Sequence, residues 1–354
     1  MQQFKAGILG ATGAVGQKFI RLLQSHPWFT IQALGASERS SGKKYWEAAH
    51  WIEDLPLPEY VADMEVRLCE PKQFRDVDFV FSGLDSSVAL EIEKAFAEAG
   101  IPVISNARNW RMDETVPLLV PEVNPDHISL IRSQQFDPEG RGWIVTNPNC
   151  VCVPFVMAAR PLYDAFGIEA AVVTSMQAVS GGGYPGVPSM DIIGNVVPYI
   201  GGEESKIHTE PLKLLGRLTE SNTVDHAKFP IQATATRVPT IEGHVLSITL
   251  KLGHPPQSVE EIKQAINGWK NPIGELDLPS SPKNAMKLYE DDRFPQPRLH
   301  ASGEGGMQLG IGRLRAAHVF DVSFVALAHN TIRGAAGGAI LNAELLVKKG
   351  YLGG

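Results

Sequence analysis

A glycine-rich turn close to the start of the chain restricts the possible folds more than any other feature of the sequence. The apolar run Phe4–Leu9 is typical of a buried strand, and Gly10-Ala11-Thr12-Gly13-Ala14-Val15-Gly16 follows it. Apolar residues at helical spacing then continue from Val15 to Leu23. Glycines between a strand and a helix allow a tight turn, close approach to a pyrophosphate and close helix–strand packing. The pattern predicts a dinucleotide site; the alternative is a glycine-rich turn without a ligand.

The loop after the next predicted strand bears on the choice between NAD and NADP. Thr30–Ala36 is predicted as a strand, and Ser37-Glu38-Arg39-Ser40-Ser41-Gly42-Lys43-Lys44 follows it. NAD sites place an acid here for the ribose 2′-hydroxyl, whereas a 2′-phosphate needs cations and hydroxyls. The serines, the arginine and the lysines favour NADP, while Glu38 favours NAD. An exposed loop of mixed charge is the remaining alternative.

Strands and helices continue to alternate through the first half of the chain. Asp78–Leu84 and Pro102–Ser105 are apolar strands, and a helix is predicted between them from Ser87 to Ala99. This alternation predicts a doubly wound parallel sheet. We expect Ser82 to lie beneath the cofactor. Arg108 follows the later strand, where ligands of such sheets bind, and either holds an anion or is a solvated loop charge.

Cys150 is the strongest candidate for a reactive group. Asn147-Pro148-Asn149-Cys150 lies between the apolar run Trp143–Thr146 and a segment with helical apolar spacing. A thiol at a helix N-terminus faces unpaired N–H groups, so we expect a lowered pKa and a nucleophile. The alternative is a buried structural cysteine.

Composition excludes several classes of protein. Formal net charge is −7 over 354 residues, so there is no basic field to attract nucleic acid or a membrane surface. No signal peptide and no apolar run of membrane-spanning length are recognised, and we expect a cytoplasmic protein. The cysteines, Cys69, Cys150 and Cys152, do not form a disulfide framework, and no cluster of histidines or carboxylates completes a metal site with them.

The second half of the chain has a different pattern. Glu169–Ser180, Ile231–Val238 and Val245–Leu252 are long predicted strands with few helices between them. They predict a mainly antiparallel α+β domain that carries the chemistry. A helix is expected from Glu203, which shares a face with Lys206; a surface ion pair is the alternative.

The C-terminal third adds an arm, a strand and a helix. Asn271 to Arg298 is rich in proline and charge and is expected to pack on a neighbouring subunit. Ala317–Ala328 is predicted as a strand. Asn330–Gly338 opens a helix through Leu346, and its small residues suit contact with the nicotinamide end of the cofactor.

Taken together, these motifs resemble the aspartate-β-semialdehyde dehydrogenase family, in its archaeal and fungal branch. The resemblance runs nearly end to end, and Gln177 follows Cys150 by 27 residues while His244 follows Arg237 by seven. The motifs that carry it are Gly10–Gly16, Ser37–Lys44, Ser105–Asn109, Asn147–Cys150, Gln177–Gly181, Glu203 with Lys206, Arg237–Pro239, Gly243-His244, Asp292–Arg298 and Asn330–Gly338.

The resemblance implies a role for each charged group. By this resemblance, Cys150 is the nucleophile and His244 is the acid–base residue. Arg237 binds the α-carboxylate of the substrate, and Glu203 accepts a hydrogen bond from the substrate ammonium. The phosphate is held by Lys206 and Arg108, and the acyl intermediate is oriented by Gln177 and Asn149. The implied reaction is NADP-dependent reduction of L-4-aspartyl phosphate to the semialdehyde, through a thioester, in lysine, threonine, methionine and isoleucine biosynthesis. Candidate cofactor contacts are Gly10, Thr12, Gly13, Ala14, Val15, Gly16, Ser37, Arg39, Ser40, Ser82, Ser180, Gly181, Asn330 and Gly334.

The resemblance also implies an architecture. The expected fold is α/β, with a Rossmann-type domain over residues 1–148 and 330–354. A glyceraldehyde-3-phosphate-dehydrogenase-like α+β catalytic and dimerisation domain covers residues 149–329. A homodimer or homotetramer is expected, with no metal and with no nucleic-acid or membrane partner.

The chain departs from the family pattern at one place, and three alternative functions need to be considered. The family follows its cysteine with small polar residues, whereas Val151-Cys152-Val153-Pro154 stand here, so contacts near the thiol differ. Malonyl-CoA reductase resembles the same scaffold. The chain argues against that function because it keeps four charged residues that an aminated, phosphorylated substrate needs: Glu203, Lys206, Arg108 and Arg237. N-acetylglutamyl-phosphate reductase has no substrate ammonium for Glu203. A non-catalytic NADP-binding sensor or scaffold is disfavoured by the intact Cys150 and His244.

Overall fold

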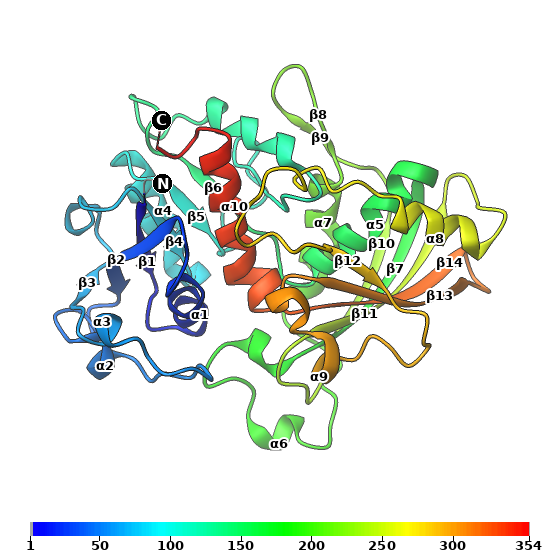
Figure 1. Ribbon diagram of the computed structural model, residues 1–354, viewed down its shortest axis with the longest axis horizontal. Helices are drawn as coiled ribbons and strands as arrows, with labels where there is room; N and C mark the ends of the chain where they lie inside the picture. Colours follow the sequence, from blue (N-terminus) through cyan, green and yellow to red (C-terminus); the bar gives the residue numbers. More distant parts are fainter. Residues whose placement is uncertain (1–2, 354) are drawn as a thin grey trace.

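The first half of the chain forms a parallel sheet with the strand order of a doubly wound dinucleotide-binding fold. The computed structural model describes residues 3–353 (Figure 1). The strands are β1 (Phe4–Leu9), β2 (Phe29–Ala36), β3 (Val66–Leu68), β4 (Phe79–Ser82), β5 (Val103–Ser105) and β6 (Ile144–Thr146). Their order is β3-β2-β1-β4-β5-β6, and all neighbours are parallel. The expected doubly wound sheet is confirmed, and its carboxyl ends share one edge.

Helices cover this sheet, and one of them comes from the far end of the chain. The helices of the first half are α1 (Ala14–Leu23), α2 (Tyr45–Ala48), α3 (Glu59–Ala62) and α4 (Ser86–Glu98), with 3₁₀ segments at Pro71–Gln73 and Pro125–Ser133. The C-terminal α10 (Gly337–Lys348) packs into the same apolar core, where Ile340 and Leu345 join Phe4 and Phe19. The chain therefore closes its first domain with its last helix (Figure 1).

A second sheet of mixed direction occupies the other half. Its strands are β7 (Ile168–Gln177), β10 (Ile231–Arg237), β11 (His244–Leu252), β12 (Met286–Leu288), β13 (Leu309–Ala316) and β14 (Val322–Ala328), in the order β10-β7-β11-β14-β13-β12. The β7–β10 and β12–β13 pairs are parallel and the other neighbours antiparallel. The expectation of a mainly antiparallel sheet is confirmed.

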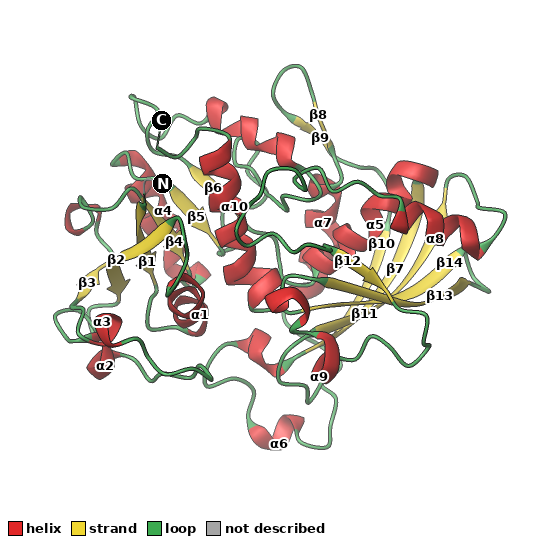
Figure 2. Ribbon diagram, in the orientation of Figure 1, coloured by secondary structure: helices red, strands yellow, loops and turns green. Residues whose placement is uncertain are grey.

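One face of the second sheet is covered, and the other is open over β7 and β10. The helices α5 (Cys152–Phe166), α7 (Glu203–Leu214) and α8 (Val259–Asn267) pack against one face (Figure 2). Burial alternates along the strands, so that Leu246 and Ile248 are buried while Val172, Gln232 and Thr234 of the opposite face are exposed.

One expectation about the C-terminal third needs correction. The predicted strand Ala317–Ala328 is wrong at its start, because Ala317 to Asp321 form a turn whose ends are joined by a backbone hydrogen bond. The arm from Asn271 to Arg298 contains the short strand β12. The remaining short elements are α6 (Ser189–Ile192), β8 (Arg217–Leu218), β9 (Val224–Asp225), α9 (Pro297–His300), 3₁₀ turns at Val179–Gly182 and Gly303–Gly306, and a π-helical turn, η5 (Ile332–Ala336). No helix within residues 3–353 is long and apolar enough to cross a bilayer.

A buried ion pair holds the C-terminal segment at the place where the two halves meet. Arg333 lies in η5, and its Nη2 donates to Oε2 of Glu122 at 2.5 Å. Both side chains are almost completely buried, so each charge depends on the other for compensation. The next residue, Gly334, packs so closely on Cys150 that an added Cβ would lie 2.7 Å from the cysteine Cβ.

Replacing Glu122 by leucine should lower stability by about 3–5 kcal/mol, because the guanidinium of Arg333 stays buried without its carboxylate. Adding Arg333→Met should recover most of this loss, since the apolar pair removes both charges. Urea denaturation measures the effect. Glu169→Leu, which breaks an exposed pair with Lys251, is the control and should cost less than about 1 kcal/mol. Equal losses for Glu122→Leu and Glu169→Leu would contradict the prediction.

Candidate active site

Cys150 lies in the turn between β6 and α5, as expected. The Oδ1 of Asn149 accepts the N–H of Val151 at 2.9 Å, and the Asn149 carbonyl accepts the N–H of Cys152 at the start of α5. The turn is thus closed by its own asparagine before the helix begins. The thiol is half-buried at the N-terminus of α5.

A histidine from the second sheet faces this thiol. His244 is the first residue of β11 and is fully buried, and its Nε2 lies 3.2 Å from the Sγ of Cys150. The backbone N–H of Ala178 donates to Nδ1 of the same ring at 3.0 Å. Because Nδ1 is an acceptor, the neutral ring carries its proton on Nε2. The sulfur therefore faces an N–H group.

Burial, and not the helix terminus, dominates the ionisation of this pair. It raises the pKa of the Cys150 thiol to about 12, and the Glu203 carboxylate adds to the effect. It also lowers the pKa of His244 to about 3, with a further contribution from the Arg237 guanidinium. Our expectation of a lowered cysteine pKa is therefore wrong for the free protein. The resting pair is a neutral thiol beside a neutral imidazole.

A charged pair from α7 and two amide side chains lie beside the thiol and the imidazole. Glu203, at the start of α7, accepts from Nζ of Lys206 at 2.6 Å, from Nδ2 of Asn149 at 3.0 Å and from Nε2 of Gln177 at 3.3 Å. Although burial opposes it, the Lys206 ammonium and these amides lower the pKa of the Glu203 carboxyl. Glu203 is therefore a carboxylate held among donors.

Two arginines lie near the same region. Arg237 ends β10, and its Nη1 donates to the carbonyl of Ala178 at 2.7 Å. Arg108 is exposed, and its Nη1 would lie 3.9 Å from a Cβ added at Gly202, the residue before α7. The Ala178 peptide thus contacts both Arg237 and His244. The structure brings together every candidate catalytic and substrate-binding residue: Cys150, His244, Arg108, Asn149, Gln177, Glu203, Lys206 and Arg237.

The candidate cofactor residues form two groups, and the first lies at the edge of the parallel sheet. A Cβ at Gly10 would lie 2.8 Å from the Gly83 carbonyl, and one at Gly16 would lie 2.3 Å from the Gly10 carbonyl. Gly10 has a positive φ of 75°, and α1 has no acidic residue in its first turn. These features suit a pyrophosphate at the α1 N-terminus. Thr12 belongs to the same turn, Ala14 and Val15 begin α1, Ser37, Arg39 and Ser40 follow β2, and Ser82 ends β4.

The second group lies beside Cys150. Nδ2 of Asn330 donates to Oγ of Ser180 at 2.8 Å, while Oδ1 of Asn330 accepts the N–H of Gly243, next to His244. A Cβ at Gly181 would lie 2.9 Å from Nη1 of Arg237. Together with Gly334 against Cys150, this group forms the wall where a nicotinamide would meet the thiol.

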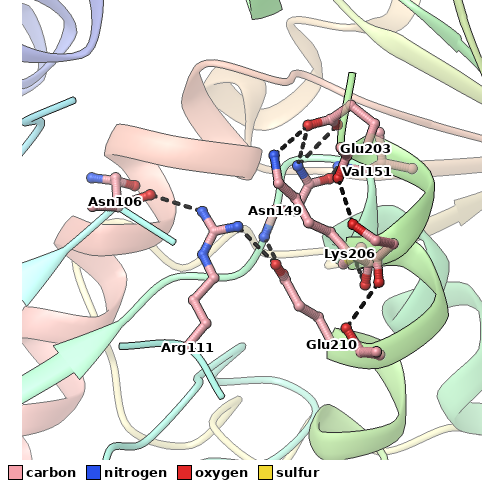
Figure 3. Close-up of polar contacts among 12 residues, drawn as sticks. Asn106, Arg111, Asn149, Val151, Glu203, Lys206 and Glu210 are labelled. Atoms are coloured by element: carbon pink, nitrogen blue, oxygen red, sulfur yellow. Dashed lines mark hydrogen bonds and ion pairs between the residues drawn. The ribbon is translucent and has the colours of Figure 1, made fainter. Parts of the chain in front are cut away.

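Sequence reasoning missed residues that support the turn Asn147–Cys150, which carries the candidate nucleophile and is called the nucleophile turn below. Glu210 of α7 accepts the backbone N–H of Asn149 at 2.6 Å, and Nη1 of Arg111 donates to Glu210 at 2.9 Å (Figure 3). Lys213 donates from the same helix to three backbone carbonyls of the 111–116 loop. A signal was present: Glu203, Lys206, Glu210 and Lys213 have helical spacing and share one face of α7. Among residues 3–353, no group of histidine, cysteine and carboxylate side chains is arranged to hold a metal ion.

Known families and relatives match this chain along nearly all of its length. Residues 5–131 match the family described as semialdehyde dehydrogenase, NAD binding domain, and residues 159–333 match semialdehyde dehydrogenase, dimerisation domain. The aspartate-semialdehyde dehydrogenase of Schizosaccharomyces pombe is 45% identical, with 98% of this chain and 99% of the relative covered. That of Archaeoglobus fulgidus is 46% identical with the same coverage.

Solved structures agree with the sequence relatives. The aspartate-semialdehyde dehydrogenase of Candida albicans, solved with NADP, superposes with a TM-score of 0.91 at 41% identity and covers 99% of this chain and 100% of its own. An aspartate-semialdehyde dehydrogenase II of Vibrio cholerae, solved in complex with ASA, gives a TM-score of 0.75 at 26% identity, with 98% and 99% covered.

The neutral state of the thiol predicts how Cys150 reacts with iodoacetamide. Because its pKa is raised, the thiolate fraction of the free protein should grow about tenfold per pH unit from pH 6 to 9, without a plateau. The rate of inactivation, followed by residual activity and peptide mass, measures this. Cys69, whose pKa burial raises to about 11, serves as the internal comparison. A plateau near neutral pH would show a thiolate–imidazolium pair and contradict the prediction.

Proposed function

Since the chain belongs to the aspartate-semialdehyde dehydrogenase family and has its activity, we propose that Cys150 is the nucleophile of this amino-acid biosynthetic reaction. The observation that carries the proposal is the 3.2 Å contact between Sγ of Cys150 and Nε2 of His244 inside a cluster of opposite charges. In the biosynthetic direction, sulfur attacks the acyl carbon of L-4-aspartyl phosphate, the bond to the phosphate oxygen breaks, and a thioester remains. NADPH, when bound, supplies the hydride that reduces it.

His244 is the proposed acid–base residue. It takes the thiol proton as sulfur attacks, so that the ring becomes an imidazolium, and it returns that proton to sulfur when the C–S bond breaks after the hydride step; the departing phosphate takes its own proton from solvent. To carry a second proton the ring must release the hydrogen bond from Ala178, because both nitrogens of an imidazolium are donors. Collapse of the reduced intermediate breaks the C–S bond and returns the thiol as the semialdehyde leaves.

The surrounding charges are matched to the proposed substrate. Arg237 offers a planar guanidinium to the α-carboxylate, and Glu203 is a carboxylate that accepts from the ammonium. Arg108 and Lys206 are the proposed phosphate ligands, on either side of the start of α7. Asn149 and Gln177, both within reach of Glu203, orient the acyl group.

The enzyme is an NADP-linked oxidoreductase with a dinucleotide-binding domain, and the finer cofactor contacts are part of the proposal. The proposed contacts are Gly10, Thr12, Gly13, Ala14, Val15, Gly16, Ser37, Arg39, Ser40, Ser82, Ser180, Gly181, Asn330 and Gly334. The exposed Arg39 and the neighbouring serines support 2′-phosphate recognition at the end of β2.

The domain division and the assembly are likewise proposed. The NADP domain comprises residues 1–148 and 330–354, and the catalytic domain comprises residues 149–329. The matched dimerisation domain indicates a homo-oligomer, and the open face of the second sheet supports a homodimer or a homotetramer built on it. The cytoplasmic location stays a prediction.

The wild-type protein should form NADPH from L-aspartate semialdehyde and NADP only when phosphate is present, followed at 340 nm as an absorbance increase. Cys150→Ser should reduce the rate by at least about 10³-fold, since a serine hydroxyl is a far weaker nucleophile here. Cys152→Ser, a buried cysteine whose Sγ contacts the Lys206 carbonyl, is the control and should keep activity. Phosphate-independent turnover would overturn the proposed reaction.

Arg39→Ala should raise KM for NADP about tenfold, the effect of losing one charge-assisted hydrogen bond. KM for NAD should change less than about twofold, because NAD lacks the phosphate that Arg39 would contact. Initial rates with both cofactors measure the ratio. Lys72→Ala, a surface cation paired with Glu70, is the control. An equal rise for NAD and NADP would remove Arg39 from the phosphate site.

A further inference from the structure

We propose that Arg111 and Glu210 are positioning residues that fix the spacing between the phosphate-binding cations and the nucleophile turn. The inference rests on the proposed function, in which Arg108 and Lys206 hold phosphate and Cys150 attacks. Neither Arg111 nor Glu210 touches the reacting atoms. Both act through backbone groups and through the elements that carry the reacting residues.

The two residues complete a closed ring of hydrogen bonds, the Arg111–Glu210 ring, that begins and ends on the nucleophile turn. Nδ2 of Asn147 donates to Oδ1 of Asn106 at 2.8 Å, and Nη2 of Arg111 donates to the Asn106 carbonyl at 2.8 Å. Nη1 of Arg111 donates to Oε1 of Glu210 at 2.9 Å, and the Asn149 N–H donates to Oε2 of Glu210 at 2.6 Å (Figure 3). The ring joins the loop after β5, α7 and the turn before Cys150.

The two charged members of this ring are buried, so their ion pair is not a surface contact. Arg111 is 7% exposed and Glu210 is 2% exposed. A buried ion pair gains little net stability over an apolar pair of the same size. Arg111 and Glu210 instead fix the directions of the hydrogen bonds in the ring. The planar guanidinium holds two acceptors at a fixed angle, and the carboxylate holds one donor on each oxygen.

The ring sets the distances on which phosphate transfer depends. Arg108 lies in the same turn as Arg111, whose N–H donates to the Arg108 carbonyl at 3.3 Å. Lys206 lies one helical turn before Glu210 on the same face of α7. The ring therefore holds both proposed phosphate ligands relative to the backbone beside Cys150. A displacement of about 1 Å in such a site is enough to cost up to 10²-fold in rate.

The deciding variants are Glu210→Gln and Arg111→Lys. Glutamine keeps one acceptor for the Asn149 N–H but loses the charge, and lysine keeps the charge but cannot hold both acceptors in one plane. In each variant KM for phosphate should rise about five- to tenfold, and kcat should fall about tenfold. KM for NADP should stay within about twofold, because the hydrogen bonds of the Arg111 and Glu210 side chains go to Asn106, Asn149 and each other, and none of these residues is a proposed cofactor contact. Glu210→Ala should be worse than Glu210→Gln, since the amide then loses its acceptor.

Glu344 provides a matched control for loss of a buried carboxylate. It is 0% exposed, accepts the Ser280 N–H at 3.0 Å and pairs with His26 at 2.8 Å, in the first domain and outside the ring. Glu344→Gln should lower Tm about as much as Glu210→Gln and leave KM for phosphate unchanged. The split between KM for phosphate and KM for NADP is what a purely structural role would not produce.

The outcomes separate the two proposals. If Glu210→Gln and Arg111→Lys keep wild-type KM for phosphate and wild-type kcat, the positioning role is wrong while the proposed function stands. If both KM values rise together, as for a general distortion of the site, the positioning role is also wrong. If the wild-type enzyme itself shows no phosphate-dependent reduction of NADP, the proposed function fails first. If Glu210→Ala does not fold, Glu210→Gln and Arg111→Lys still test the positioning role.

Discussion

The nucleophile turn is held by hydrogen bonds to groups from both halves of the molecule, and the rest of the site depends on this. The side chain of Asn147 contacts Asn106, the Ala335 carbonyl and Asn342, so it is bound to the first domain and to the C-terminal segment. Asn149 is bound through its side chain to Glu203 and through its backbone to Glu210. These hydrogen bonds therefore fix the position of Cys150 relative to both domains.

The same burial that fixes the site also sets its electrostatics. In the free protein it keeps the thiol and the imidazole neutral, while Glu203 stays ionised because Lys206 and two amides compensate it. The charged groups that remain match the charges proposed for the substrate. Substrate thus enters a site whose charges are already placed, and the reactive pair becomes ionic only during the reaction.

Local patterns in the sequence predicted local structure well. They failed for features that depend on groups far apart in the sequence. The strand, glycine turn and helix at residues 4–23 follow from apolar periodicity, and the doubly wound order was predictable from alternation. Arg111 and Glu210 are 99 residues apart, so nothing in the sequence indicates that they meet. The cysteine pKa was misjudged for a similar reason, because the helix N-terminus is a local feature while burial by the second domain is not. Glycines at 310 and 312 interrupt the apolar pattern of β13, so the strand was not predicted.

The contact of Gly334 with Cys150 determines when the site can form during synthesis of the chain. The turn that bears the thiol is synthesised 184 residues before the glycine that closes its wall. The last helix also fills the core against the first strand. A chain still being translated therefore has Cys150 but neither the glycine that packs on it nor the helix that fills the core of the first domain. The site is complete only after Gly334 and α10 have docked, so a shorter nascent chain lacks it.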